Sequence, residues 1–199
     1  MKKILILLTI AITTLGLSAC NNEPSTLEEA LDHLDGADSY TIYTRISRAF
    51  VGPYETWEHI DGHKSYVIGK NAHAEEIDQE YYLYIDEDNH RYAYTRDMSG
   101  QWVRNRIEEE PSEPITDEDD FMSMSADWFE KKNGTYVLNS DYYDQFFQEA
   151  QVSMTSLEIN VEEGNLYMTY KLLDEGGNTL TINTAITDID NTTVELPFE

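Results

Sequence analysis

The residue best placed for chemistry is Cys20, the only cysteine in this chain of 199 residues. A single cysteine cannot form a disulfide within its own chain, so its position needs another explanation. Cys20 follows an apolar run from Ile4 to Leu17, and that run follows Lys2 and Lys3. A charged start and a short apolar run are typical of a secretory signal, whereas a membrane span needs about 20 apolar residues. The sequence therefore predicts export.

The last residues of this segment are Leu17, Ser18, Ala19 and Cys20, and all four resemble the lipobox of bacterial lipoproteins. The resemblance implies cleavage before Cys20 and a diacylglyceryl group on its sulfur. Because two acyl chains give stable anchoring, we expect a signal peptide over 1–19 and a lipidated cysteine with its tether over 20–25. The protein would then sit on the extracytoplasmic face of the cell membrane. The alternative is an ordinary secretory signal with an incidental cysteine.

Histidines and carboxylates are the other candidates for chemistry. His59 and His63 are four residues apart across a predicted turn, but a zinc site needs three or four converging ligands. The run 86–89 partly resembles a calcium loop, yet Arg91 stands where that loop needs glycine. The sequence contains no G-x-S-x-G motif and no glycine-rich phosphate loop. We therefore predict no metal, no cofactor and no enzyme activity. A hydrolase would need carboxylates of raised pKa in a cleft.

Aromatic residues on predicted strands are better candidates for binding. Alternate positions on two neighbouring strands project to one face, and a third strand adds a tryptophan, so together they could line a groove for an apolar ligand. These residues are Tyr82, Tyr84, Tyr92, Tyr94 and Trp102. Phe146 and Phe147 could form a lid over such a ligand. For both groups the alternative is packing within the protein.

The composition limits the class of partner. The chain has 39 acidic and 13 basic residues and a net charge of −26. Nucleic acid is disfavoured because its phosphates need clustered Lys and Arg. An anionic membrane would also repel the body, so we expect the lipid to provide the anchoring. Hydrophobic content of 40% with 14 tyrosines argues against disorder.

The elements that position these residues follow from periodicity and turn residues. Residues 26–34 predict a short amphipathic helix, because Thr26 and Glu29 form a capping box and Gly36 ends it. Period-two patterns predict strands, with Gly52 and Pro53 closing the first. The expected strands are 39–50, 54–60, 64–69, 80–85, 91–96, 101–107, 157–161, 166–172, 180–186 and a hairpin around Asn133-Gly134.

The remaining segments predict a loop and further helices. Residues 108–120 form an acidic loop by composition, 121–127 a helical turn and 142–150 a helix with a broad aromatic face. Strand runs predominate without the spacing of parallel units. We therefore expect one α+β domain over 26–199: a large, curled antiparallel sheet of about 10–11 strands, with two or three short helices on its concave face.

In this order of elements the chain resembles the LolA/LppX-like superfamily of bacterial lipoprotein and lipid carriers, and within it the small lipoproteins of Gram-positive bacteria. The stretches that carry the resemblance are LEEALDHLDGADSYTIYTRI, YYLYIDEDNHRYAYTRDMSGQWVR, FEKKNGTYVL and ITDIDNTTVELP. The resemblance implies an unclosed half-barrel with helices over an apolar cavity that accepts acyl chains. A tether at Cys20 disfavours shuttling between membranes.

The sequence therefore leads to one main functional hypothesis. It is a membrane-anchored, non-enzymatic lipoprotein that binds a hydrophobic ligand, such as a lipid or acyl chain, in a half-barrel cavity. The alternative is an interaction module that contacts a partner protein or the cell wall through its curved sheet or its acidic 108–120 loop.

Overall fold

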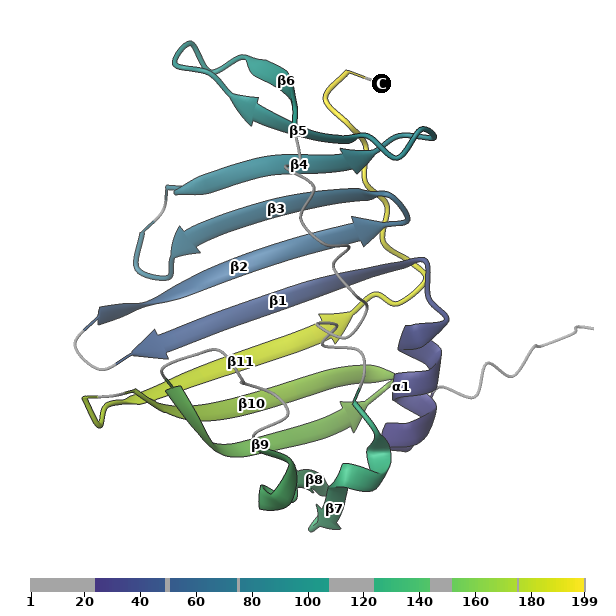
Figure 1. The fold of residues 1–199 in the computed structure, drawn as a ribbon, viewed down its shortest axis with the longest axis vertical. Helices are drawn as coiled ribbons and strands as arrows, with labels where there is room; N and C mark the ends of the chain where they lie inside the picture. The colour runs from purple at the N-terminus through teal and green to yellow at the C-terminus, as the bar shows by residue number, and fades with distance from the viewer. Residues whose placement is uncertain are drawn as a thin grey trace, which may run out of the picture.

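A computed structural model describes residues 24–48, 51–74, 76–107, 124–143, 152–174 and 176–198. These residues form a single sheet of 11 strands in the order β6-β5-β4-β3-β2-β1-β11-β10-β9-β8-β7, with one α-helix, α1 (Figure 1). All neighbouring strands are antiparallel, and the sheet does not close. The predicted large antiparallel sheet is therefore confirmed.

Connections of seven residues or fewer join consecutive strands, except between β6 and β7 and between β8 and β9, where the chain runs through 107–128 and 139–151. The first and last long strands, β1 and β11, pair with each other at the centre of the sheet. The strands are β1 Ser39–Arg48, β2 Val51–Asp61, β3 Lys64–Asn71, β4 Gln79–Ile85, β5 Arg91–Arg96, β6 Trp102–Arg106, β7 Phe129–Lys132, β8 Thr135–Leu138, β9 Val152–Glu162, β10 Asn165–Asp174 and β11 Thr179–Thr187.

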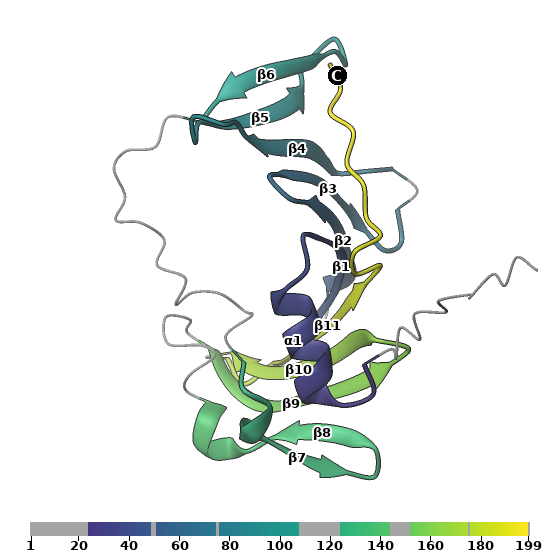
Figure 2. The same cartoon turned by 90° about the vertical axis from the view of Figure 1, so that its right-hand side faces the viewer.

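The sheet is strongly curled, as expected for a sheet of this size. Figure 2 shows α1 on the concave side, against the arm that contains β9, β10 and β11. The chain after β11 crosses to the convex side and runs along it toward β5. There the Thr192 hydroxyl lies 3.1 Å from that of Thr41, and the Asp61 carboxylate accepts a hydrogen bond from the Val194 amide at 3.0 Å.

Helix α1 (Leu27–Asp35) forms because its sequence both caps it and gives it one apolar face. The Thr26 hydroxyl accepts a hydrogen bond from the Glu29 amide, and the Glu29 carboxylate accepts one from the Thr26 amide. These two bonds satisfy amides that a helix start otherwise leaves unpaired. Leu27 and Leu34 lie on the buried face, and Gly36 caps the C-terminal end. The predicted helix and its capping box are confirmed.

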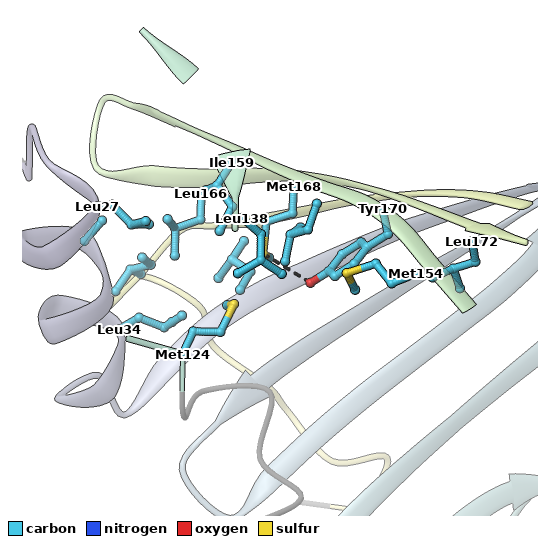
Figure 3. Close-up of a cluster of buried hydrophobic side chains, with 14 residues drawn as sticks. Leu27, Leu34, Met124, Leu138, Met154, Ile159, Leu166, Met168, Tyr170 and Leu172 are labelled. Atoms are coloured by element: carbon cyan, nitrogen blue, oxygen red, sulfur yellow. Dashed lines mark hydrogen bonds between the residues drawn. The ribbon is translucent and has the colours of Figure 1, made fainter. Parts of the chain in front are cut away.

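The hydrophobic core lies between α1 and the concave face of β9–β11 (Figure 3). Within it, the Tyr170 hydroxyl donates to the Met168 sulfur at 3.4 Å, and burial raises the pKa of Tyr170. The largest fully buried side chains all come from α1 and these three strands. They are Leu27, Leu157, Ile159, Leu166, Met168, Leu172 and Ile186.

The helices differ from the prediction. Two or three short helices were expected over the concave face, whereas the described residues contain one α-helix and two single-turn 3₁₀ helices, η2 (Ala126–Trp128) and η3 (Ser140–Tyr142). Side chains at the caps explain both turns, because Ser125 accepts from the amide two residues on, and so does Asn139. Most of the predicted helix over 142–150 and the acidic loop over 108–120 lie outside the described residues.

Two strand boundaries also differ. Gly52 and Pro53 do not end a strand but lie inside β2. The register between β1 and β2 shifts between Ile46 and Arg48, so Pro53 sits where the ladder is already interrupted. Strand β9 begins at Val152, five residues before the predicted start, because a second register shift lets its first residues pair with the end of β10.

Candidate functional site

The pairing registers assign every strand residue to one face of the sheet, because directly opposed residues project to the same side. On the concave face, Ile42 of β1 is opposite Glu58 of β2, which is opposite Val67 of β3. Ile42 also packs against the core cluster beneath α1. Alternation then places Ile68, the next residue of β3, on the convex face. Adjacent residues of one strand therefore belong to two different surfaces.

The concave face of β2–β4 forms the first candidate surface, which we call the open concave surface. Figure 2 shows no described helix across these strands, in contrast to the α1 side of the sheet. Its side chains are mostly apolar or small, and Val67 at its centre is only 8% exposed. The surface consists of Thr56, Glu58, Ile60, Ser65, Val67, Tyr81 and Leu83.

Glu58 is the exceptional residue of this surface. Among the strand side chains described on the concave face of β1–β6 and β9–β11, the only other charged one is Arg91, at the end of β5. Burial raises the pKa of the Glu58 carboxyl. Burial also raises the pKa of Tyr81, with a further contribution from the nearby charge of Glu58. Since Val67 is opposite both residues, Glu58 and Tyr81 flank it as a polar pair within apolar surroundings.

The convex face of β3–β6 forms the second candidate surface, which we call the basic aromatic surface. It contains all five predicted aromatic residues: Tyr82 is opposite Tyr94, and Tyr84 is opposite Tyr92. The prediction that they share one face is confirmed, but that face points away from α1. A role for them in binding an apolar ligand stays a prediction. The surface consists of Lys64, Tyr66, Ile68, Lys70, Glu80, Tyr82, Tyr84, Tyr92, Tyr94, Arg96, Trp102, Arg104 and Arg106.

The rings of the basic aromatic surface contact each other across the strands. Tyr66 and Tyr82 stack with centroids 4.4 Å apart, and Trp102 meets Tyr82 edge-on at 5.0 Å. Guanidinium groups cover two more rings: Arg104 lies 3.6 Å from the Tyr92 centroid and Arg96 lies 4.2 Å from that of Trp102. Cation–π pairs of this kind contribute about 0.5–1 kcal/mol each at exposed sites.

Glu80 is the single carboxylate on the basic aromatic surface, and it is neutralised within it. Its two oxygens accept hydrogen bonds from the Arg96 guanidinium at 2.8 Å and from the Tyr66 hydroxyl at 2.7 Å. The bond from Arg96 is the main reason that the pKa of Glu80 is lowered. Burial, together with the bond to Glu80, raises the pKa of Tyr66. Glu80 therefore does not offset the charge of the remaining arginines.

The other predicted site residues are not described by the structure. Leu17, Ser18, Ala19 and Cys20 precede the first described residue, Pro24, and Phe146 and Phe147 fall in the gap at 144–151. Pro24 itself is ordered against the turn between β9 and β10, where a Cβ on Gly164 would lie 3.1 Å from its ring. The chain therefore enters the body at this turn, beside the start of α1.

No model of a known protein family matches the chain, and no curated protein matches its sequence. None of the described residues forms a helix long and apolar enough to cross a membrane.

A pocket beside the start of α1 is polar. Its described lining includes Glu29, Asp32, Glu163, Asp188 and Asp190. This density of carboxylates does not suit an acyl chain, and within the described ranges no group of His, Cys, Asp and Glu could hold a metal ion. His33 joins the lining and lies 3.2 Å from Asp190. We assign this pocket no ligand.

Neither His59 nor His63 belongs to a described group of three or more possible metal ligands. His59 projects from β2 on the convex face, with its Nδ1 3.0 Å from the Thr41 hydroxyl, and His63 lies exposed in the next turn. Sequence reasoning also missed Glu58. The available signal was its alternation with Ile60 and Thr56 in β2. Which side faces α1 is set by the long-range pairing of β1 with β11 and the packing of α1 against β9–β11.

Proposed function

We propose that this protein is a membrane-anchored, extracytoplasmic lipoprotein that holds a hydrophobic ligand, such as an acyl chain, against the open concave surface. The observation that carries the proposal is the contrast in charge on this surface. The chain has 39 acidic residues, but Glu58 is the only one among the described concave side chains of β2–β4. Apolar side chains on a curved face that no described helix covers favour burial against an apolar partner.

Glu58 and Tyr81 would fix the orientation of the ligand. Binding an acyl chain over Val67 removes water from both polar side chains, and that removal has a cost unless the ligand bonds to them. A ligand with a hydroxyl, amide or amine at one end can donate to the Glu58 carboxylate and bond to the Tyr81 hydroxyl. The proposed ligand is therefore amphiphilic, with its polar end at Glu58 and its acyl chain over Val67 and Leu83.

The lipid anchor would hold this surface near the membrane. Cys20 precedes Pro24 by four residues, which span at most about 14 Å when extended. The turn between β9 and β10, where Pro24 packs, would therefore stay close to the bilayer. This part of the proposal rests on the residues that resemble a lipobox.

Two adjacent residues of β3 provide a matched test of ligand binding. The body from Asn21 onward contains every described element, and it can be titrated with a fluorescent long-chain alcohol and inspected by native mass spectrometry for bound lipid. Val67→Gln on the concave face is expected to weaken probe binding about tenfold, since a buried contact worth about 1.4 kcal/mol is lost. Ile68→Gln on the convex face is the control and should leave binding unchanged. Absence of lipid and of probe binding, or equal effects of both substitutions, would contradict the proposal.

The anchor has its own test. Expressed in a bacterium, the full chain should be recovered from membranes with a mass that corresponds to a chain starting at Cys20 plus a diacylglyceryl group. Cys20→Ala should release the protein into the extracytoplasmic fraction. If the substituted protein stays on membranes to the same extent, the lipid does not anchor it.

A further inference from the structure

We propose that the basic aromatic surface on the convex side of β3–β6 is a second binding site, and that its partner is an anionic polysaccharide. This site is separate from the open concave surface, because the same strands carry the two sites on opposite faces. It does not depend on the proposed apolar ligand.

Charge complementarity carries the proposal. In a chain with 13 basic and 39 acidic residues, the described strand positions of this face carry five basic residues and a single carboxylate, Glu80. They are Lys64, Lys70, Arg96, Arg104 and Arg106. A cluster of one charge sign on a body of the opposite sign concentrates its field locally and selects a ligand of matching charge.

Two of these arginines are available to a ligand. Arg104 and Arg106 alternate on β6, so both project from the convex face, and both are exposed. Arg104 contacts the rings of Tyr92 and Tyr94. Among the described residues, no carboxylate pairs with either arginine. Guanidinium groups bind carboxylate, sulfate and phosphate oxygens through paired hydrogen bonds, so each can receive one anionic group.

The ring geometry favours a polysaccharide over a nucleic acid. Nucleobases bind to sheets by stacking on free aromatic faces. Here Tyr66 and Tyr82 stack on each other, and Arg104 occupies the Tyr92 face. The rings therefore offer edges and hydroxyl groups, which suit the hydroxyls of sugars.

The position of the surface favours a flexible polymer over a bilayer. The chain enters the body at Pro24, beside the turn between β9 and β10, whereas the arginines lie on β6 at the other end of the sheet (Figure 1). Seven strand spacings separate β10 from β6, about 34 Å along the curve. A convex face also meets a flat membrane only along its crest. A polymer can follow this curvature.

The test is equilibrium binding of the full chain, in neutral detergent, to fluorescein-labelled polygalacturonate, with neutral dextran as the uncharged comparison. Polygalacturonate is expected to bind, with an affinity that falls about tenfold between about 50 and 200 mM salt as counterion release predicts. Arg104→Glu with Arg106→Glu should reduce the affinity at least about tenfold. The matched control reverses two charges elsewhere, Lys132→Glu with Lys171→Glu, and should change the affinity less than about twofold.

Folding is checked by far-ultraviolet circular dichroism and by the single variant Arg106→Glu, whose side chain has no described partner and should leave the melting temperature unchanged. That variant alone should still weaken binding about threefold. The proposal is overturned if polygalacturonate does not bind at low salt, if the arginine variants bind as the wild type does, or if single-stranded DNA or phosphatidylglycerol micelles bind more tightly.

Discussion

The two arms of the curled sheet use the same antiparallel pairing but bury their side chains differently. In the arm formed by β9–β11 with α1, which we call the packed arm, Leu157, Ile159 and Leu166 are completely buried. In the arm formed by β2–β6, which we call the open arm, Val67 and Tyr94 are the only described hydrophobic side chains in the buried class. Helix α1 forms a second layer over the packed arm, whereas no described helix covers the open arm.

This difference separates stability from binding. Folding free energy comes mainly from apolar area removed from water, so the packed arm contributes most of it. No described helix covers the open arm, although the chain after β11 runs along its convex side, where Phe198 contacts Tyr94. Partners can therefore contact its concave face and the convex positions that this segment leaves exposed. The two faces of the open arm differ in charge, since Glu58 is the one charged side chain described on the concave face of β2–β4, whereas the strand positions of the basic aromatic surface carry five basic residues. We expect substitutions to affect stability in the packed arm and ligand binding in the open arm.

The largest expected effect is on the core of the packed arm. Leu157→Ala should lower the free energy of unfolding by about 3–4 kcal/mol, because it removes a fully buried side chain and leaves a cavity. The same change at Leu83, half-buried on the open concave surface, should cost about 1 kcal/mol. Urea unfolding of both variants gives the comparison. Equal losses in the free energy of unfolding would mean that the two arms contribute equally to stability.

The helix cap is a smaller test of the packed arm. Thr26→Ala removes the hydroxyl that accepts the Glu29 amide hydrogen bond and should cost about 1 kcal/mol. Thr26→Ser keeps the hydroxyl and serves as the control. The measurement is thermal unfolding of both variants. A loss in Thr26→Ser as large as in Thr26→Ala would show that the cap hydrogen bond is not the cause.

Substitutions on the convex face of the open arm should change the free energy of unfolding less. Arg104→Ala removes the guanidinium that covers Tyr92 and should lower the free energy of unfolding by about 0.5 kcal/mol. Val103→Ala, on the other face of the same strand, controls for edge-strand effects. Urea unfolding measures both. A loss of several kcal/mol at Arg104 would mean that this face is structural, in contrast to the proposed binding role.

Substitution of Glu58 should give the smallest change in melting temperature, and the size of that change depends on pH. Burial raises its pKa in the folded state, so the folded carboxyl binds a proton more tightly than the unfolded one, and stability falls as pH rises between the ordinary and raised pKa values. Glu58→Gln should therefore melt at a higher temperature than the wild type near pH 7, and the gap should close near pH 4.

Asp97 provides a control of opposite sign for that prediction. The Ser99 hydroxyl and backbone amides donate to its carboxylate and lower its pKa. Its contribution to stability is therefore present at neutral pH and lost as pH falls through the lowered pKa. Asp97→Asn should melt below the wild type near pH 7. If Glu58→Gln also melts below the wild type near pH 7, as Asp97→Asn should, burial does not raise the pKa of Glu58.

Local patterns predicted the elements, but not the side that each strand presents. The capping box located α1, and the alternation of Tyr82 with Tyr84 placed them on one face, because both features depend on near neighbours in sequence. Which face becomes concave depends on where α1 packs, and that contact joins residues more than 100 positions apart, such as Leu27 and Leu157. Glu58 therefore could not be distinguished in advance from the other acidic residues.

The central claim, that an acyl chain lies on the open concave surface, can be tested directly with a long-chain alcohol that carries a photoreactive diazirine. After irradiation of the bound complex, tandem mass spectrometry identifies the labelled residues. The account predicts labels on Ile60, Val67, Tyr81 and Leu83, with none on their convex neighbours Ile68 and Tyr82. Labels on the convex residues, on the packed arm, or spread over both faces would contradict it.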